Sequence, residues 1–253
     1  MGRVISVSNQ KGGVGKTTTT VNVAAFCAEK GKRVLIIDID PQANAGFGIG
    51  INAEDSERTI YEVLIGGITL REAIVPSGLE RLDLVPSSIH LSGAQVDLLD
   101  MAEKEFILRS AIQDVRAEYD YIFIDCPPSL GILTLNSLVA ADSVMIPLQC
   151  EYYALEGLSQ LLRIIAMVQE NLNRGLAIEG VVLTMYDSRT NLSQQVVSDV
   201  REYFGDRVFK TIIPRNVRLS EAPSFGKPIG YYDRGSIGSS TYDNLAEEVI
   251  NHD

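Results

Sequence analysis

The sequence predicts an α/β fold, in which a doubly wound, mostly parallel β-sheet carries helices on both faces. Three observations support this fold class. Five short apolar runs are rich in Val and Ile rather than alternating with polar residues, as in strands buried on both faces. Segments with apolar residues three or four positions apart, which is a helical spacing, lie among these runs. The composition, 45% hydrophobic and 22% charged, is that of a globular chain. Strands that alternate with helices form βαβ units and a parallel sheet.

The predicted strands are residues 3–8 (RVISVS), 33–38 (RVLIID), 121–125 (YIFID), 143–148 (SVMIPL) and 178–184 (IEGVVLT). The predicted helices are residues 17–30, which Gly31 would end, 153–171 and 192–204. Residues 46–93 are less regular, and we expect them to form insertions at an edge of the sheet. Because no linker or repeat divides the chain, residues 1–253 are expected to form a single domain.

Composition restricts the class of function. A net charge of −11 argues against a generally basic nucleic-acid coat, although it leaves room for a local basic patch. The three cysteines, Cys27, Cys126 and Cys150, form no CxxC and no metal-ligand spacing, which suits a reducing cytoplasm. No apolar run approaches the roughly 20 residues that a membrane span needs, so we expect a cytoplasmic protein.

The first strand-like run leads directly into residues 9–18 (NQKGGVGKTT) and then into a helix. Glycines allow successive backbone N–H groups to face phosphates, and the helix presents its positive N-terminus to the same anion. Lys16 would reach the β- and γ-phosphates, and the Thr17 hydroxyl would ligate Mg²⁺. The predicted nucleotide-binding residues of this loop are Lys11, Gly12, Gly13, Val14, Gly15, Lys16, Thr17 and Thr18.

The loop departs from the pattern G-x-x-x-x-G-K-[ST], because Gln10 holds the first glycine position, and it carries an additional lysine, Lys11. A cation five residues before Lys16 is poorly placed to fold back onto phosphates held by its own loop. It could cross a two-fold axis to the phosphates of a partner subunit and act there as an arginine finger does.

The segments QKGGVGKTTT, VLIIDIDPQAN and YIFIDCPPSLG closely resemble the deviant-Walker P-loop ATPases of the ParA/MinD family, above all its chromosomal ParA (Soj) branch. The resemblance continues through PLQCEYYALEGLSQLL and TIIPRNVRLSEAPSFGKPI, so it covers nearly the whole chain. It implies a P-loop NTPase fold of the deviant Walker A type, with ATP and Mg²⁺ as cofactors. It also implies slow ATP hydrolysis by a sandwich homodimer closed over two nucleotides. That dimer would bind double-stranded DNA non-specifically and respond to a ParB-type partner, in chromosome or plasmid partitioning at the nucleoid.

Three aspartates follow predicted strands at the edge where ligands bind in open α/β sheets. The resemblance implies that Asp40 positions or activates the attacking water, so Lys11, Lys16 and Asp40 are the expected catalytic residues. Thr17, Asp38 and Asp125 are the expected supports of the metal. Aspartate at a strand–helix junction also caps helices, and this alternative stays open, above all for Asp38.

Two further groups of residues follow from the resemblance. Pro214 and Asn216 would contact the adenine base, with Met185 packed on the ring; an ordinary turn is the alternative for Pro214 and Asn216. Residues 189–234 hold eight basic and five acidic side chains. Arg189 and Arg218 match DNA-contacting positions, and Arg215 is a third candidate, with plain solvated arginines as the alternative. Contacts of this kind address phosphates and are indifferent to base sequence.

Three other functions were weighed. A MinD-like cell-division or protein-positioning ATPase is the main alternative, but such proteins end in a basic amphipathic helix that lies on lipid. Residues 245–253 are short and acidic, so no membrane anchor is expected. An iron–sulfur carrier needs two suitably placed cysteines per subunit, which the spacing of Cys126 and Cys150 does not resemble. A self-repressing plasmid ParA would carry an N-terminal helix-turn-helix region, which is not expected here.

Overall fold

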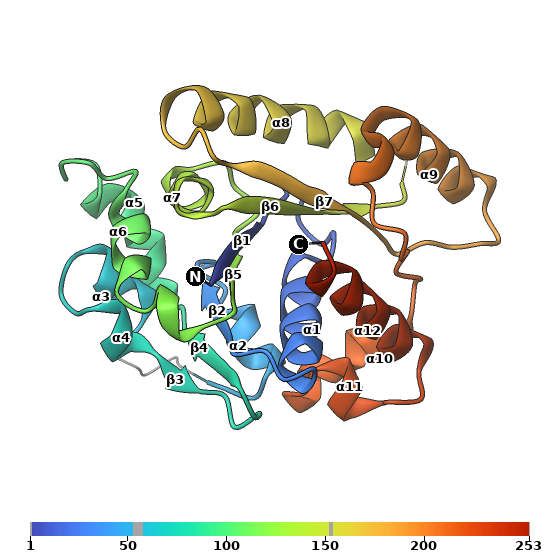
Figure 1. Cartoon of the computed structure of the whole chain (residues 1–253), viewed down its shortest axis with the longest axis horizontal. Helices are drawn as coiled ribbons and strands as arrows, with labels where there is room; N and C mark the ends of the chain where they lie inside the picture. The colour runs from blue at the N-terminus through green and yellow to red at the C-terminus, as the bar shows by residue number, and fades with distance from the viewer. Residues whose placement is uncertain (1, 53–57, 152–153, 253) are drawn as a thin grey trace.

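The centre of the molecule is a seven-stranded sheet with the strand order β3-β4-β2-β5-β1-β6-β7 (Figure 1). The computed structural model describes residues 2–52, 58–151 and 154–252. Its strands are β1 (Arg3–Val7), β2 (Val34–Asp38), β3 (Val75–Pro76), β4 (Leu82–Val85), β5 (Tyr121–Asp125), β6 (Ser143–Gln149) and β7 (Ala177–Thr184). All neighbouring strands are parallel except β3 and β4, which confirms the predicted doubly wound, mostly parallel sheet.

The five predicted strands correspond to β1, β2, β5, β6 and β7. The expectation for residues 46–93 needs correction, because this region supplies two strands of the sheet itself. In β4, Leu82 pairs with Val34 of β2 and Leu84 pairs with Ile36, and β3 closes the edge. With four and two residues, these strands are too short to show a clear apolar pattern.

Helices cover both faces of the sheet (Figure 1). The face that receives Ile5 and Val7 carries α1 (Lys16–Glu29), α2 (Asn44–Gly48), α10 (Val217–Glu221), α11 (Ile229–Tyr232) and α12 (Ile237–Ile250). The face that receives Val4 carries α3 (Ile60–Leu64), α4 (Leu70–Ala73), α5 (Ala94–Asp97), α6 (Ile107–Gln113), α7 (Ile132–Ala140), α8 (Ala154–Asn171) and α9 (Asn191–Phe204). Successive strand residues therefore fill two separate cores, as the pleat requires.

Local signals explain the ends of the predicted helices. Helix α1 closes before Gly31, whose φ of +84° is a left-handed conformation that glycine adopts without strain. Helix α9 begins where the Thr190 hydroxyl accepts the backbone N–H of Ser193. Helix α8 was predicted from Tyr153, which lies outside the described residues, and is observed over Ala154–Asn171.

Helix α12 was not predicted, and it packs along α1. Its apolar side chains Leu245, Ala246 and Val249 are fully buried, and its Tyr242 hydroxyl lies 3.2 Å from Thr19 Oγ1. The apolar side of this helix is therefore used inside the fold. Among the residues that the structure describes, we find no helix with the length and apolar character needed to cross a bilayer.

Candidate nucleotide site

The loop between β1 and α1 lies at the carboxyl edge of the sheet, where the candidate site is built. Asn9 anchors its start, because its Nδ2 donates to Pro147 O at 2.8 Å and its Oδ1 accepts the Lys11 N–H at 3.0 Å. Gly13 and Gly15 have φ values of +72° and +90°, which residues with a Cβ rarely adopt. These glycines fix the curvature that brings the loop over the end of α1.

The N-terminus of α1 is open to an anion. Gly15 is its N-cap, no side chain caps the helix, and its first turn holds no acidic residue. The first N–H groups of a helix have no intrahelical acceptor, so they point at whatever occupies the loop. Lys16 begins this helix and is largely buried, and its Nζ donates to Lys11 O at 3.1 Å. Burial lowers the pKa of Lys16, against the opposing effect of Asp125, Cys126 and Asp40. These features fit the phosphates of a nucleotide.

Asp125, at the end of β5, lies against the first turns of α1. Thr17 Oγ1 donates to its Oδ2 at 2.6 Å, and Thr20 Oγ1 donates to its Oδ1 at 2.9 Å. Burial raises the pKa of Asp125 to about 6, while the two threonine hydrogen bonds lower it. The structure thus brings together Thr17 and Asp125, two of the three expected metal supports. The described residues hold no group of three His, Cys, Asp or Glu side chains that could bind a metal by themselves, but Mg²⁺ shared with phosphates and water needs only one or two protein ligands.

Asp38, the third expected metal support, is fully buried and already engaged. Its Oδ1 accepts the Asp40 N–H and its Oδ2 accepts the Ala45 N–H, each at 3.0 Å. Burial and the neighbouring Asp125 raise the pKa of Asp38 well above its usual value. Both oxygens therefore hold the turn that carries Asp40 and the first turn of α2, as the capping alternative predicted. A contribution to the metal's water shell stays a prediction.

Asp40 lies at the wall of a hollow of about 430 Å³ above the P-loop. Its Oδ1 accepts the Gln42 N–H at 3.0 Å, which stiffens the turn after β2. The predicted residues that line this hollow are Gly12, Gly13, Gly15, Lys16, Thr17, Thr18, Asp40 and Met185. Sequence reasoning missed Asn22, Phe47, Pro128 and Lys227, which also line it. Pro128 and Lys227 lie inside the segments that carry the family resemblance, and Asn22 and Phe47 follow such segments by three residues.

The predicted adenine segment adjoins the phosphate loop. Tyr186 N–H donates to Ile213 O and Arg215 N–H donates to Tyr186 O, at 3.1 and 2.9 Å. This pairing sets Met185 beside Pro214, and both line a hollow of about 360 Å³ that shares Gly15, Thr18 and Met185 with the larger one.

Asn216 also lines the smaller hollow, and its Oδ1 caps α10 by accepting the Arg218 N–H at 2.8 Å. Met185 itself has a φ of +52°, an uncommon conformation for a residue with a side chain.

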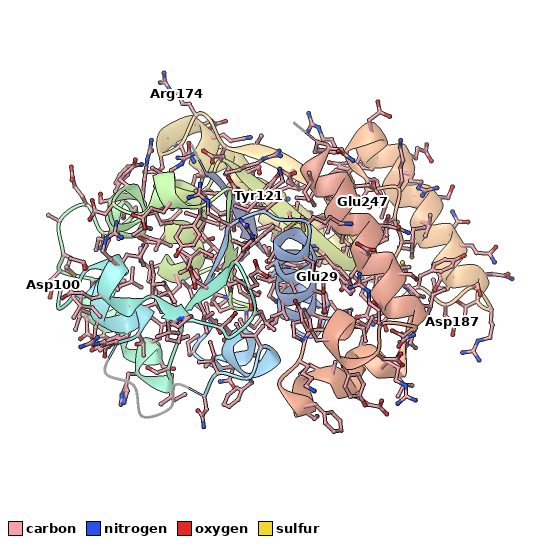
Figure 2. All side chains as sticks on the ribbon, turned by 60° about the horizontal axis from the view of Figure 1, so that its bottom comes forward. Glu29, Asp100, Tyr121, Arg174, Asp187 and Glu247 are labelled. Carbon is pink, nitrogen blue, oxygen red and sulfur yellow. The ribbon has the colours of Figure 1, made fainter. Side chains whose placement is uncertain are left out.

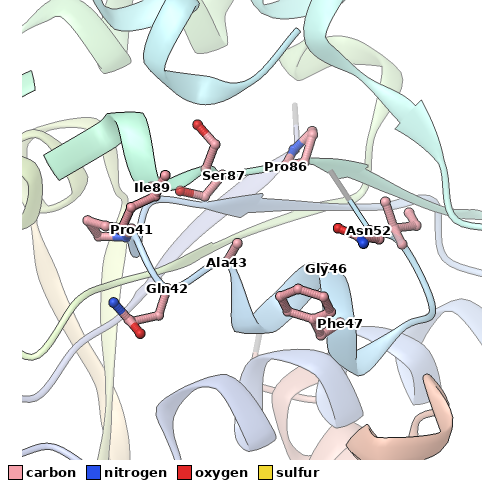
Figure 3. A pocket seen from close by; sticks show the side chains of 11 residues that line it. Pro41, Gln42, Ala43, Gly46, Phe47, Asn52, Pro86, Ser87 and Ile89 are labelled. Carbon is pink, nitrogen blue, oxygen red and sulfur yellow. The ribbon is translucent and has the colours of Figure 1, made fainter. Parts of the chain in front are cut away.

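A third hollow, of about 410 Å³, extends the site toward β4 (Figure 3). It lies between the turn after β2 and the segment after β4, and Gln42 and Phe47 line both it and the P-loop hollow. The hydroxyls of Ser87 and Ser88 in its wall are buried and have no hydrogen-bond partner within the described chain.

The three candidate DNA-contacting arginines lie on the surface, and each has a carboxylate beside it. Arg189 donates to both oxygens of Asp187, at 2.9 and 2.7 Å, on the outer loop before α9, where Figure 2 labels Asp187. This pair lowers the pKa of Asp187. The count of basic and acidic side chains over residues 189–234 begins at Arg189 and therefore leaves out Asp187, the carboxylate paired with this arginine.

The other two arginines are paired in the same way. Arg218 pairs with Glu221 at 2.9 Å and with Asp233 at 3.4 Å, and Arg215 lies 3.9 Å from Glu151. Side chains so exposed can still reach a phosphate, but the neighbouring carboxylates reduce the positive potential that they present.

The cysteines have the character of core residues. All three thiols are buried, and burial raises the pKa of Cys27 to about 12 and that of Cys150 to about 11. Cys126 lies within hydrogen-bonding distance of Ser6 and Ser137. Buried thiols of this kind offer no surface ligand for a cluster shared between two subunits.

A strand, a glycine-rich loop and an uncapped helix, with a buried lysine and a threonine–aspartate pair, define the class of P-loop nucleotide hydrolases. The family model described as an AAA domain matches residues 2–178. Sporulation initiation inhibitor protein Soj of Bacillus subtilis (strain 168) is 55% identical, with 98% of each chain covered. Chromosome partitioning protein ParA of Myxococcus xanthus is also 55% identical, over 100% of this chain and 89% of that protein.

Among solved structures, the cell division ATPase MinD of Pyrococcus furiosus has a TM-score of 0.81 at 27% identity and covers 99% of both chains. The chain belongs to the Soj/ParA family of chromosome-partitioning ATPases, and the predicted resemblance and ATP-hydrolysing activity are confirmed.

Proposed function

We propose that this chain is a partition ATPase whose ATP-bound homodimer binds DNA non-specifically and whose slow hydrolysis, stimulated by a ParB-type partner, resets it. The observation that carries this proposal is a continuous site along the carboxyl edge of the sheet, which joins the P-loop, Asp40 and the adenine segment. Cobyrinic acid a,c-diamide synthase from Mycobacterium smegmatis is 38% identical, with a TM-score of 0.88 over 100% of this chain and 96% of that one, and its solved structure contains an ATP analogue and magnesium.

Each residue of the site has a proposed task. Lys16 and the P-loop N–H groups bind the phosphates, and Thr17 with Asp125 holds the metal, while Asp38 fixes the turn that carries Asp40. Bound Mg²⁺ supplies charge neutralisation at the phosphate oxygens. Asp40 orients the attacking water, and Pro214, Asn216 and Met185 receive the base. Turnover below the range of kinases, roughly 1–100 per second, is expected, because the resemblance implies slow hydrolysis.

The proposal of a dimer rests on the open space around Gly12 in the P-loop. Apart from its two neighbours in the chain, a Cβ on Gly12 would meet no heavy atom of the described residues within 4 Å, which leaves room for close approach by a second subunit. Lys11, the residue before Gly12, has 38% of its side chain exposed. In the proposed dimer, its ammonium reaches phosphates held by the second subunit.

DNA binding is proposed for the ATP-bound dimer through Arg189, Arg215 and Arg218. Two subunits double the number of phosphate contacts, and affinity that depends on released counterions rises steeply with that number. Such a protein would act in the cytoplasm, on the nucleoid, with residues 1–253 as a single domain.

The test is co-sedimentation with non-specific duplex DNA in the presence of ATP, ADP or no nucleotide, across a salt series. We expect binding with ATP alone, which weakens steeply as salt rises. Absence of binding in every nucleotide state would contradict the DNA switch and favour a MinD-like protein-positioning ATPase.

A further inference from the structure

Glu151 is a charged residue of the site to which sequence reasoning gave no role. It stands two residues beyond the end of β6, at the carboxyl edge where the P-loop also lies. About 46% of its side chain is exposed, so nothing in the core requires its charge. Two of its partners, Lys11 of the P-loop and Arg215 of the adenine segment, belong to the candidate site.

The Glu151 carboxylate contacts two segments that are far away in the sequence and one residue of its own segment. Its Oε2 accepts the Lys11 Nζ at 3.3 Å, across 140 residues. Its Oε1 accepts the Gln149 Nε2 at 2.5 Å and lies 3.9 Å from the Arg215 Nη2. Gln149 thus orients one oxygen, while the other faces the lysine that distinguishes this P-loop from the common pattern.

Lys11 is held at both its backbone and its side chain. Its N–H donates to Asn9 Oδ1 at 3.0 Å, and its carbonyl accepts the Lys16 Nζ at 3.1 Å. The backbone is therefore fixed by the loop, and the four-carbon side chain remains the movable part. In the single chain, the Lys11 ammonium lies 3.3 Å from the Glu151 carboxylate.

We propose that Glu151 is a positioning residue for Lys11, which holds the lysine ammonium on its own subunit and releases it when a second subunit brings phosphates within reach. This inference rests on the proposed function, because it takes from it the dimer in which Lys11 acts across the two-fold axis. Glu151 then opposes closure without nucleotide, since an empty partner offers Lys11 no anion in exchange. Phosphates of a bound nucleotide compete with one carboxylate and displace it.

The Lys11–Glu151 ion pair is expected to have a modest effect, because both side chains are partly exposed to solvent. Exposed ion pairs change equilibria modestly, by at most about five-fold, so Glu151→Gln should produce effects of roughly two- to five-fold rather than complete loss. Glutamine keeps the shape of the side chain and removes its charge. Glu170→Gln, at an exposed glutamate of α8, removes the same charge elsewhere and is the matched control.

The contact itself can be tested in the nucleotide-free protein. Acylation of individual lysines by limiting acetic anhydride is followed by mass spectrometry, with the exposed Lys210 as internal reference. Glu151 holds the Lys11 Nζ at 3.3 Å, and a side chain held in one place meets the reagent less often than one that moves freely. We expect Lys11 to acylate two- to five-fold faster in Glu151→Gln and at the unaltered rate in Glu170→Gln. Equal Lys11 rates in all three proteins would overturn the proposal.

The proposed effect of Glu151 on dimer closure is tested by ATP-dependent dimerisation, measured by light scattering in the absence of DNA. Glu151→Gln should reach half-maximal dimerisation at a two- to five-fold lower ATP concentration, and it should have no effect when Lys11→Ala is also present. Weaker dimerisation of Glu151→Gln, or the same effect with and without Lys11, would show that Glu151 does not act through Lys11. If the unaltered chain forms no dimer with ATP, the proposed function fails and the release step fails with it, while the acylation rates still report the contact.

Discussion

Gly12→Val should separate the stability of the fold from the assembly of the dimer. Apart from its chain neighbours, a Cβ at this position meets no heavy atom of the described residues within 4 Å, and the backbone of Gly12 lies outside the left-handed region. The added Cβ therefore meets neither a clash with the described residues nor backbone strain, and we expect the free energy of unfolding to change by no more than about 0.5 kcal/mol. Gly15→Ala is the matched contrast, because a φ of +90° makes any Cβ cost about 1–3 kcal/mol.

Urea unfolding without nucleotide, followed by circular dichroism, measures the first effect. Light scattering with ATP measures the second, in an Asp40→Ala background in which hydrolysis cannot deplete the dimer. We expect Gly12→Val to unfold as the unaltered chain does and to remain a monomer with ATP. Dimers of Gly12→Val at ordinary ATP concentrations would refute the placement of Gly12 at the interface. A loss of stability above about 1 kcal/mol would refute the inference that its surroundings are open.

Four further outcomes are expected. Lys16→Ala should abolish ATP binding in calorimetry; because burial already disfavours the charged ammonium, its urea midpoint should not fall, and a fall would assign Lys16 to the fold. Asp40→Ala should bind ATP and stay on DNA without hydrolysis, and faster release than the unaltered chain would contradict the role of Asp40. Thr20→Val leaves Asp125 Oδ1 without its donor and should destabilise the chain by about 1–3 kcal/mol in urea, whereas an unchanged midpoint would show that the bond contributes nothing. Arg189→Glu combined with Arg218→Glu should abolish DNA co-sedimentation and spare dimerisation, and loss of both would make these arginines structural.

The parts of the fold that were predictable have local causes. Residues 3–8 and 121–125 are short runs rich in Val or Ile that end in polar residues, and this pattern is typical of a buried parallel strand. The P-loop was recognisable because its glycines are required by the backbone itself, as the φ values of Gly13 and Gly15 show. In contrast, β4 and α12 were missed, since the burial of Leu84 and Leu245 depends on β2 and α1, which are distant in the chain.

The class of fold, the phosphate loop and the three aspartates at the carboxyl edge could be predicted from sequence, because each depends on a few adjacent residues. How those residues are used depends on contacts between distant parts of the chain, which the folded structure shows. It gave both Asp38 oxygens to backbone N–H groups, paired Thr17 with Asp125 and placed Glu151 against Lys11. It also set carboxylates beside the three surface arginines. A side chain has several possible partners, and the one it meets is determined by which strands become neighbours in the sheet, a long-range outcome that no short stretch of sequence encodes.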